Sequence, residues 1–399
     1  MKFQKKVLKN GMVVLFEKRD VPVVSLAFAV RHGGINESEG KKGISHYIEH
    51  MLYKGTEKRS AQKIAEEIER NGGILNGFTS ELVTAFWCKM SSEHLDVALD
   101  VLGDMIKNSL FNGKELEKER KVIFEEIKMR KDNPRIYVLD KIQELLYEKP
   151  FGISVIGTYE SMNSINREEI FRKFREVYKP NNLILCVVGN AEFEKVANFA
   201  EKNFGNEKGK IPSFKVRTKN EFRTEKRKGI DQSHLVLAYH VPLANDKKSH
   251  AANVLNVLMA GGMSSRLFQE IREKRNLAYG VIGESSISND FAYSLIYVGT
   301  TKEKIGEVKK LILEEFYKVE KNLGEEELKQ VKEQMIGNYK IEMEDSQSQM
   351  FNLIAYEIDS KAEDFYEFEK RIREVKLNDV KELAKKARKK YSLFVLESE

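Results

Sequence analysis

The stretch Gly43-Ile-Ser-His-Tyr-Ile-Glu-His-Met-Leu-Tyr-Lys-Gly55 decides how the rest of this chain is understood. His46, Glu49 and His50 are spaced i, i+3 and i+4, which places all three on one face of a helix. Two imidazoles one turn apart can bind a single zinc ion, and a carboxylate between them can reach water on that ion. With seven histidines in 399 residues, a chance cluster of this kind is uncommon. The stretch therefore predicts a helix that presents two metal ligands and a reactive carboxylate.

The length and composition of the chain are those of a protein with two folded domains. A chain of 399 residues exceeds one ordinary hydrophobic core, and 41% hydrophobic residues suffice to fill two. The net charge of +6 arises from 68 basic and 62 acidic residues, which does not require nucleic acid as a partner. No apolar run reaches the length of a membrane span, and residues 1–10 lack the apolar segment of a secretion signal. We therefore expect neither a nucleic-acid nor a membrane partner.

The only two cysteines, Cys88 and Cys186, each lie in an apolar, β-rich run. This placement is typical of buried, reduced thiols and not of a zinc site or a disulfide framework. We therefore expect a cytoplasmic protein.

The pattern of apolar residues predicts strands and helices that recur in two halves of the chain. The expected strands lie at 7–17, 23–30, 74–90, 183–188, 235–241, 280–286, 292–299 and 393–396. The expected helices include the motif helix and those at 114–130, 138–147, 167–178, 192–204, 249–259 and 302–322, with a long helical region from 324 onward.

The lysine-rich segment 209–228 shows no clear period and is expected to link a domain at 1–208 to a domain at 229–399. The two halves resemble copies of one unit, because Leu116 in Gly113-Lys-Glu-Leu aligns with Leu328 in Gly324-Glu-Glu-Glu-Leu. In this alignment Glu119 falls on Val331 and Glu126 on Asn338, and the second half has no His-x-x-Glu-His. We therefore expect a shared scaffold in which only the first half holds metal.

A catalytic zinc usually has three protein ligands and one water, so a third ligand is expected on the acidic helix 114–130. Glu119 and Glu126 share a face of that helix with Val122, but they stand about 10 Å apart along its axis and cannot both bind one ion. Glu125 is a rival that points about 100° away from Glu126. The residues alone leave this choice open, since an acidic helix is most often a solvated face.

His46-x-x-Glu49-His50, followed downstream by Glu126, has the order of the inverted zinc-protease motif and resembles the pitrilysin family of zinc metallopeptidases. The similarity covers essentially the whole chain and is greatest to the branch that includes the mitochondrial processing peptidase β-subunit. It implies an α+β fold of two homologous domains, each a mostly antiparallel sheet packed with helices. The segment that ends in Glu126-Ile is similar to the family segment in which the third ligand precedes an apolar residue. The resemblance therefore implies Glu126 as the ligand, instead of Glu125, and Glu119 as the auxiliary glutamate.

A second similarity concerns the edge strand with which the family pairs the substrate backbone. It implies that the substrate-binding residues are Asn76, Gly77, Phe78, Thr79 and Ser80. Family members commonly have Ala where Gly77 stands, and a glycine loosens a strand.

The stretch from Ser264 to Tyr279 resembles the family's second signature, whose Arg and Tyr match Arg272 and Tyr279 and reach across to the zinc site. A phenol can donate to the oxyanion of a peptide undergoing hydrolysis, and an Arg can hold a substrate carbonyl or carboxylate. Without the resemblance, Arg272 would be taken for a surface helix residue and Tyr279 for a half-buried strand residue.

Together these features predict a zinc-dependent endopeptidase with one Zn²⁺ per chain, bound by His46, His50 and Glu126. Glu49 is expected to act as general base toward zinc-activated water. The resemblance further implies that two chains, as a homodimer, enclose a chamber that admits unfolded peptides. The alternative is a non-catalytic or partner subunit of a hetero-oligomeric processing peptidase, although such chains generally lack the ligand set that this chain has.

Overall fold

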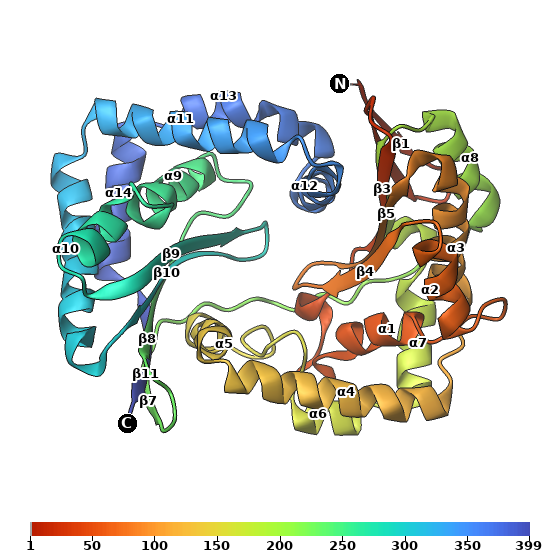
Figure 1. The fold of residues 1–399 in the computed structure, drawn as a ribbon, viewed down its shortest axis with the longest axis horizontal. Coiled ribbons are helices and arrows are strands. Elements are labelled where there is room, and N and C mark those ends of the chain that lie inside the picture. Colours follow the sequence, from red (N-terminus) through yellow and green to blue (C-terminus); the bar gives the residue numbers. More distant parts are fainter. Residues whose placement is uncertain (1) are drawn as a thin grey trace. The chain divides into compact units, whose positions relative to one another are not determined.

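Two mixed β-sheets, one in each half of the chain, form the frame on which the helices pack (Figure 1). The computed structural model describes residues 2–399. The first sheet has six strands, in the spatial order β1 (Lys2–Val7), β2 (Val13–Lys18), β6 (Leu183–Gly189), β3 (Val23–Val30), β5 (Thr84–Ser91) and β4 (Ile74–Thr79). The second has five, in the order β7 (Phe222–Arg227), β11 (Ser392–Ser398), β8 (Ser233–His240), β10 (Ala292–Thr300) and β9 (Ala278–Ile287). The expected α+β fold with two mostly antiparallel sheets is confirmed.

Fourteen α-helices surround these sheets within residues 2–399. Those of the first half are α1 (Ile44–Leu52), α2 (Ala61–Glu69), α3 (Leu95–Asn108), α4 (Gly113–Asp132), α5 (Pro134–Leu146), α6 (Tyr159–Ser164), α7 (Arg167–Val177) and α8 (Phe193–Asn203). Those of the second half are α9 (Ser249–Ala260), α10 (Ile305–Asn322), α11 (Glu325–Glu342), α12 (Ser346–Asp359), α13 (Phe368–Arg373) and α14 (Leu377–Lys389). In the described part of the chain, no helix is both long and apolar enough to span a bilayer.

The two sheets repeat one topology. Each contains one parallel pair, β2 with β6 and β7 with β11, while its remaining pairs are antiparallel. Leading from those pairs, the order β2-β6-β3-β5-β4 matches β7-β11-β8-β10-β9. Leu116 and Leu328, which the sequences of the two halves align, are both 2% exposed on the corresponding helices α4 and α11. The topology thus supports the expected duplication.

Packing divides the chain into two compact units that exchange segments between the sequence halves. The first unit contains the residues up to Lys128, then Ile153–Lys215 and Glu342–Phe365, so that α12 packs on β3 and β6. The second contains Met129–Gly152, Val216–Ile341 and Tyr366–Glu399, so that α5 packs on β8 and β11. The division into domains at 1–208 and 229–399 stays a prediction. The structure shows in addition that α5 and α12 each pack in the unit of the other half.

Three local expectations differ from the structure. The strand expected at 7–17 covers the turn of a hairpin and most of β2 but misses β1 except for Val7, because Gly11 adopts a left-handed conformation (φ 90°) that turns β1 back onto β2. The strand expected at 74–90 is also a hairpin, closed by a bond of 2.8 Å from Ser80 N to Val83 O. Strand β7 lies within the expected linker, because it is a charged edge strand that carries no apolar alternation.

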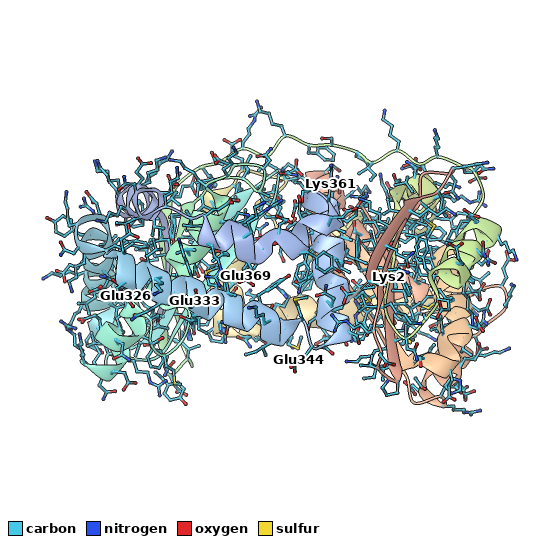
Figure 2. All side chains as sticks on the ribbon, turned by 90° about the horizontal axis from the view of Figure 1, so that it is seen from above. Lys2, Glu326, Glu333, Glu344, Lys361 and Glu369 are labelled. Atoms are coloured by element: carbon cyan, nitrogen blue, oxygen red, sulfur yellow. The ribbon has the colours of Figure 1, made fainter. Side chains whose placement is uncertain are left out.

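The charged residues lie mainly on the surface, often as ion pairs. On α11, Glu326 and Glu333 occupy the same exposed face two turns apart (Figure 2). Glu333 accepts from Arg373 at 2.6 Å. Cys88 and Cys186 are buried and form no disulfide, as expected.

Candidate metal centre

The face of α1 that carries His46, Glu49 and His50 depends on how the chain enters that helix. Gly43 precedes α1 with φ 91°, and a Cβ there would lie 2.5 Å from Met162 Cε, so only glycine fits. The buried carboxylate of Glu37 accepts from Gly43 N at 2.9 Å and from Ser45 N at 2.7 Å. These bonds satisfy amides that the first helical turn leaves without partners, and the helix dipole favours a carboxylate there. The rotation of α1 is thereby fixed from its first residue.

His46, His50 and Glu126 form a group of three potential ligands whose donor atoms all lie within 4.8 Å of one another. The Nε2 atoms of His46 and His50 are 3.2 Å apart. Glu126 Oε2 lies 3.3 Å from His46 Nε2 and 3.6 Å from His50 Nε2. The two histidines come from α1 and the glutamate from α4, so the group joins two helices.

These distances fit a tetrahedral metal ion. A zinc ion with bonds of about 2.0–2.1 Å spaces its ligand atoms about 3.3–3.4 Å apart, close to the three separations in this group. Two imidazoles and one carboxylate are also a donor set typical of catalytic zinc, which keeps a fourth position for water. The residues present therefore fit the ion.

Glu119 contacts the opposite edge of the His50 ring. Its Oε2 lies 2.9 Å from His50 Nδ1, and its Oε1 accepts from Lys54 Nζ at 2.8 Å. A carboxylate on Nδ1 holds the proton there and leaves Nε2 free to bind metal. Glu119 thus orients the candidate ligand His50 without itself belonging to the ligand group. Glu125, by contrast, is exposed on α4.

The electrostatics of His50 follow from these carboxylates. Burial alone would lower its pKa, but the hydrogen bonds with Glu119 and Glu126 outweigh burial and raise the pKa to about 9. Burial would raise the pKa of the Glu119 carboxyl group, but its contacts with His50 and Lys54 outweigh burial and lower that pKa. In the metal-free protein, the site therefore holds a protonated imidazole between carboxylates.

Glu49 lies on the same helical face as the ligands and is held from the neighbouring strand. Thr79 Oγ1 donates to Glu49 Oε2 at 2.5 Å. Burial raises the pKa of Glu49, against the opposing hydrogen bond from Thr79. A carboxyl group with a raised pKa beside a metal position suits proton transfer.

Gly77 lies against this carboxylate. A Cβ at Gly77 would stand 3.4 Å from Glu49 Oε1 and 2.5 Å from the hydroxyl of Tyr53. The glycine that departs from the family pattern therefore makes room for the Tyr53 hydroxyl.

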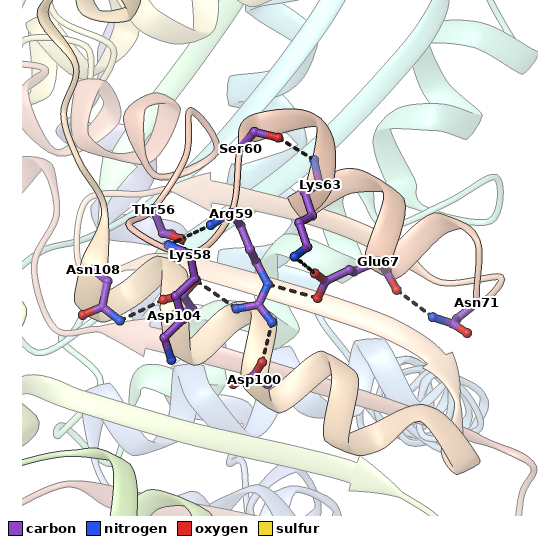
Figure 3. Close-up of polar contacts among 10 residues, drawn as sticks. All are labelled: Thr56, Lys58, Arg59, Ser60, Lys63, Glu67, Asn71, Asp100, Asp104 and Asn108. Carbon is purple, nitrogen blue, oxygen red and sulfur yellow. Dashed lines mark hydrogen bonds and ion pairs between the residues drawn. The ribbon is translucent and has the colours of Figure 1, made fainter.

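A partly buried ionic network fixes the segment that follows α1 (Figure 3). Arg59 is 9% exposed and bonds to Asp104 at 2.9 Å, to Glu67 at 3.0 Å and to Asp100. Thr56 donates to Asp104 at 2.6 Å. One guanidinium thus ties the segment after α1 to α2 and α3.

The residues expected to bind substrate lie on β4, at the edge of the first sheet, except Ser80. Ser80 belongs to the turn into β5, where its Oγ accepts from Val83 N at 3.3 Å. The Thr79 hydroxyl donates its hydrogen bond to Glu49. The Asn76 side chain is exposed and accepts a hydrogen bond from the amide of Gly77.

Arg272 and Tyr279 lie together in the second unit. The Arg272 guanidinium stands 4.8 Å from the ring centroid of Phe268 and 4.9 Å from that of Tyr279. Arg272 belongs to a π-helical turn, Phe268–Glu273, and Tyr279 to β9. The residue pattern alone suggests a half-buried Tyr279, but its side chain is 78% exposed because β9 is an edge strand. That this pair reaches the metal stays a prediction.

Several supporting residues have no clear signal in the sequence. Glu37, Tyr53 and Arg59 act through contacts made only in the folded chain. Lys54 is the exception, since it follows His50 by one helical turn and its spacing alone could have indicated it.

Two family models match the chain. The model described as Insulinase (Peptidase family M16) matches residues 12–159, and the model described as Peptidase M16 inactive domain matches residues 164–335. The "Uncharacterized zinc protease YmxG" of Bacillus subtilis is 35% identical over 350 residues, which cover 86% of this chain and 85% of that protein. An "Uncharacterized zinc protease" of Rickettsia felis is 34% identical over 338 residues, covering 83% and 81%. The crystal structure of a protease from Helicobacter pylori shares the fold, with a TM-score of 0.91, 23% identity and 99% of both chains covered.

Proposed function

The chain belongs to peptidase family M16, and we propose that it is a zinc-dependent endopeptidase acting on unfolded peptides. The observation that carries this proposal is the joint geometry of His46, His50 and Glu126, with Glu49 on the same helical face. The similar proteins from Bacillus subtilis and Rickettsia felis, both named as zinc proteases, support the same reaction class.

In this proposal the metal is held by His46, His50 and Glu126, one ion per chain. Zinc supplies Lewis acidity, which makes water nucleophilic near neutral pH and polarises a peptide carbonyl. Glu49, held by Thr79, takes the proton from the attacking water and passes it to the leaving amine. Glu119 keeps the His50 ring in the tautomer that binds the metal.

The substrate is proposed to bind as an added strand along the free edge of β4. Main-chain bonds to Asn76, Gly77 and Phe78 would supply affinity with little dependence on sequence. Thr79 would instead serve by holding Glu49. An extended main chain is available only in an unfolded segment, so the proposal predicts selection for unfolded substrates.

Arg272 and Tyr279 are proposed to complete the site from the second half, with the phenol donating to the oxyanion and the guanidinium holding a substrate carbonyl. The exposure of Tyr279 and its contact with Arg272 support a shared role. We further propose a cytoplasmic homodimer that encloses the substrate, an arrangement that the resemblance implies.

The first experiment tests whether Glu126 or its neighbour Glu125 binds the metal. Glu126→Gln should lose zinc on dialysis, whereas Glu125→Gln should retain it, because Glu125 is exposed and lies outside the ligand group. Elemental analysis of both variants makes the comparison, and equal zinc retention would defeat the choice of Glu126.

The second experiment tests the reaction. Glu49→Gln should keep zinc and abolish cleavage of a long unfolded peptide, which a chelator should inhibit reversibly in the unmodified protein. Cleavage by the Glu49→Gln protein would remove Glu49 from the mechanism. Zinc binding without any cleavage by the unmodified protein would favour the alternative, a partner subunit of a hetero-oligomeric peptidase.

A further inference from the structure

One face of α10 forms an open groove in the second unit. The groove has a volume of about 490 Å³ and is bordered by α14. Leu313 at its floor is half-buried, and Tyr317 is 48% exposed. The lining residues that matter here are Gly306, Lys309, Lys310, Leu313, Tyr317 and Arg388.

The duplication identifies the helix of the first half that corresponds to α10. A short 3₁₀ turn precedes α3 at Ser92–His94, and another precedes α10 at Lys302–Lys304, which sets Leu95 on Ile305. In this register the buried inner faces of the two helices coincide. Ala98, Val101, Leu102, Met105 and Ile106 of α3 fall on Val308, Leu311, Ile312, Glu315 and Phe316 of α10, and all ten are buried.

On α3, a second face is covered by another helix, α8, and the segment after it. Asp96 pairs with Lys195 of α8 at 2.8 Å. The ring of Phe199 stands directly over Gly103, where a Cβ would lie 3.0 Å from it. A third contact is made by Lys107, which lies 5.4 Å from the ring centroid of Phe204.

The same positions on α10 line the groove. In the register set above, Asp96 falls on Gly306, Gly103 on Leu313 and Lys107 on Tyr317. The positions through which α3 contacts α8 and the segment after it therefore correspond to the positions that line the open groove on α10.

The charges around the groove indicate the kind of helix that would fit. Lys309, Lys310 and Arg388 line it. Lys310 pairs with Glu314 at 3.7 Å and Arg388 with Glu320 at 3.0 Å, so the rim keeps a small net positive charge. An apolar floor with a net positive rim complements a helix with an apolar stripe and acidic flanks. We propose that this groove binds an acidic amphipathic helix of a partner protein, in the way that α3 binds α8.

The test uses a labelled peptide with the sequence of residues 192–205, in which Lys195→Glu and Lys202→Glu make the flanks acidic while Phe199 is kept. Fluorescence anisotropy would follow its binding to the full chain carrying Glu49→Gln, which prevents cleavage. We expect saturable binding that is weakened about tenfold or more by Lys309→Glu with Lys310→Glu, and by added salt. The unaltered 192–205 peptide should bind less tightly.

A second variant separates the groove from the substrate site. Leu313→Asp should abolish peptide binding yet, with Glu49 intact, leave cleavage of an unfolded substrate unchanged, which also shows that the variant folds. No saturable binding up to about 1 mM acidic peptide, or equal binding by the charge-reversed variant, would overturn the proposal. If the unmodified chain is an oligomer that Leu313→Asp dissociates, the groove holds a second copy of this chain, which would also overturn it. Peptide binding itself is measured without zinc or cleavage, and if the unmodified chain cleaves nothing, circular dichroism replaces cleavage as the evidence that Leu313→Asp folds.

Discussion

Replacing Glu119 by glutamine should weaken zinc binding although it removes no metal ligand. Glu119 joins His50 Nδ1, at 2.9 Å, to Lys54 Nζ, at 2.8 Å. The amide of glutamine can accept from one of these partners only, and it turns N–H groups toward the other. The His50 tautomer that leaves Nε2 for the metal is then no longer enforced. Loss of such a contact behind a ligand costs about 10- to 100-fold in metal affinity, or about 1.4–2.7 kcal/mol.

Competition with a chromogenic chelator would measure the zinc affinity of the unmodified protein and of Glu119→Gln. Glu125→Gln is the matched control, because it makes the same change at an exposed position of the same helix. Lys54→Met should produce a smaller loss, since it leaves the bond between Glu119 and His50 in place. Equal zinc affinities for Glu119→Gln and the unmodified protein would refute this account of Glu119.

Four further predictions concern protons, charges and space. Zinc binding at about pH 7.5 should release close to one proton, because the pKa of metal-free His50 is about 9, and calorimetry in buffers of different ionisation enthalpy measures it. The same raised pKa stabilises the metal-free protein fully below about pH 6.5, an effect lost as the pH rises through about 9, which denaturant titrations across that range would detect. Arg59→Met should cost about 3–5 kcal/mol in urea unfolding, because it strips the cation from buried Asp104, and a loss under about 1 kcal/mol would contradict this. Gly77→Ala should cost about 1–3 kcal/mol through its clash with the Tyr53 hydroxyl, and adding Tyr53→Phe should recover part of it in the same assay, since the close approach to the Ala85 carbonyl remains.

The sequence could predict those parts of the site that rest on local periodicity. His46, Glu49 and His50 were found because helical spacing determines which side chains share a face. Most elements follow from apolar patterns and the α+β class from the family resemblance, whereas the predicted strands at 7–17 and 74–90 each run through the turn of a hairpin.

Long-range contacts had no comparable signal. The choice between Glu119, Glu125 and Glu126 depends on how α4 lies against α1, which no spacing within α4 can reveal. Likewise, the cap supplied by Glu37 and the bond from Thr79 join residues that only the folded chain brings together. The family resemblance indicated the choice of Glu126, but neither the cap from Glu37 nor the bond from Thr79 to Glu49.

The exchanged helix α12 gives the second half a role in completing the first sheet. Its contacts with that sheet include buried polar ones: Ser346 bonds to Ser25 at 2.8 Å, and Gln349 donates to Glu17 at 2.7 Å.

Buried polar groups are costly without partners, so this face of the sheet requires a helix with matching polar positions. On the second sheet the exchanged helix α5 is held partly by aromatic contacts, such as that of Tyr137 with Phe394 at 6.1 Å. An aromatic contact depends mainly on shape and buried area, whereas the serine and glutamine contacts depend on particular donors and acceptors. Although its positions equivalent to Glu119 and Glu126 are Val331 and Asn338, the second half therefore still supplies a segment that the half with the candidate metal site needs to bury its own polar residues.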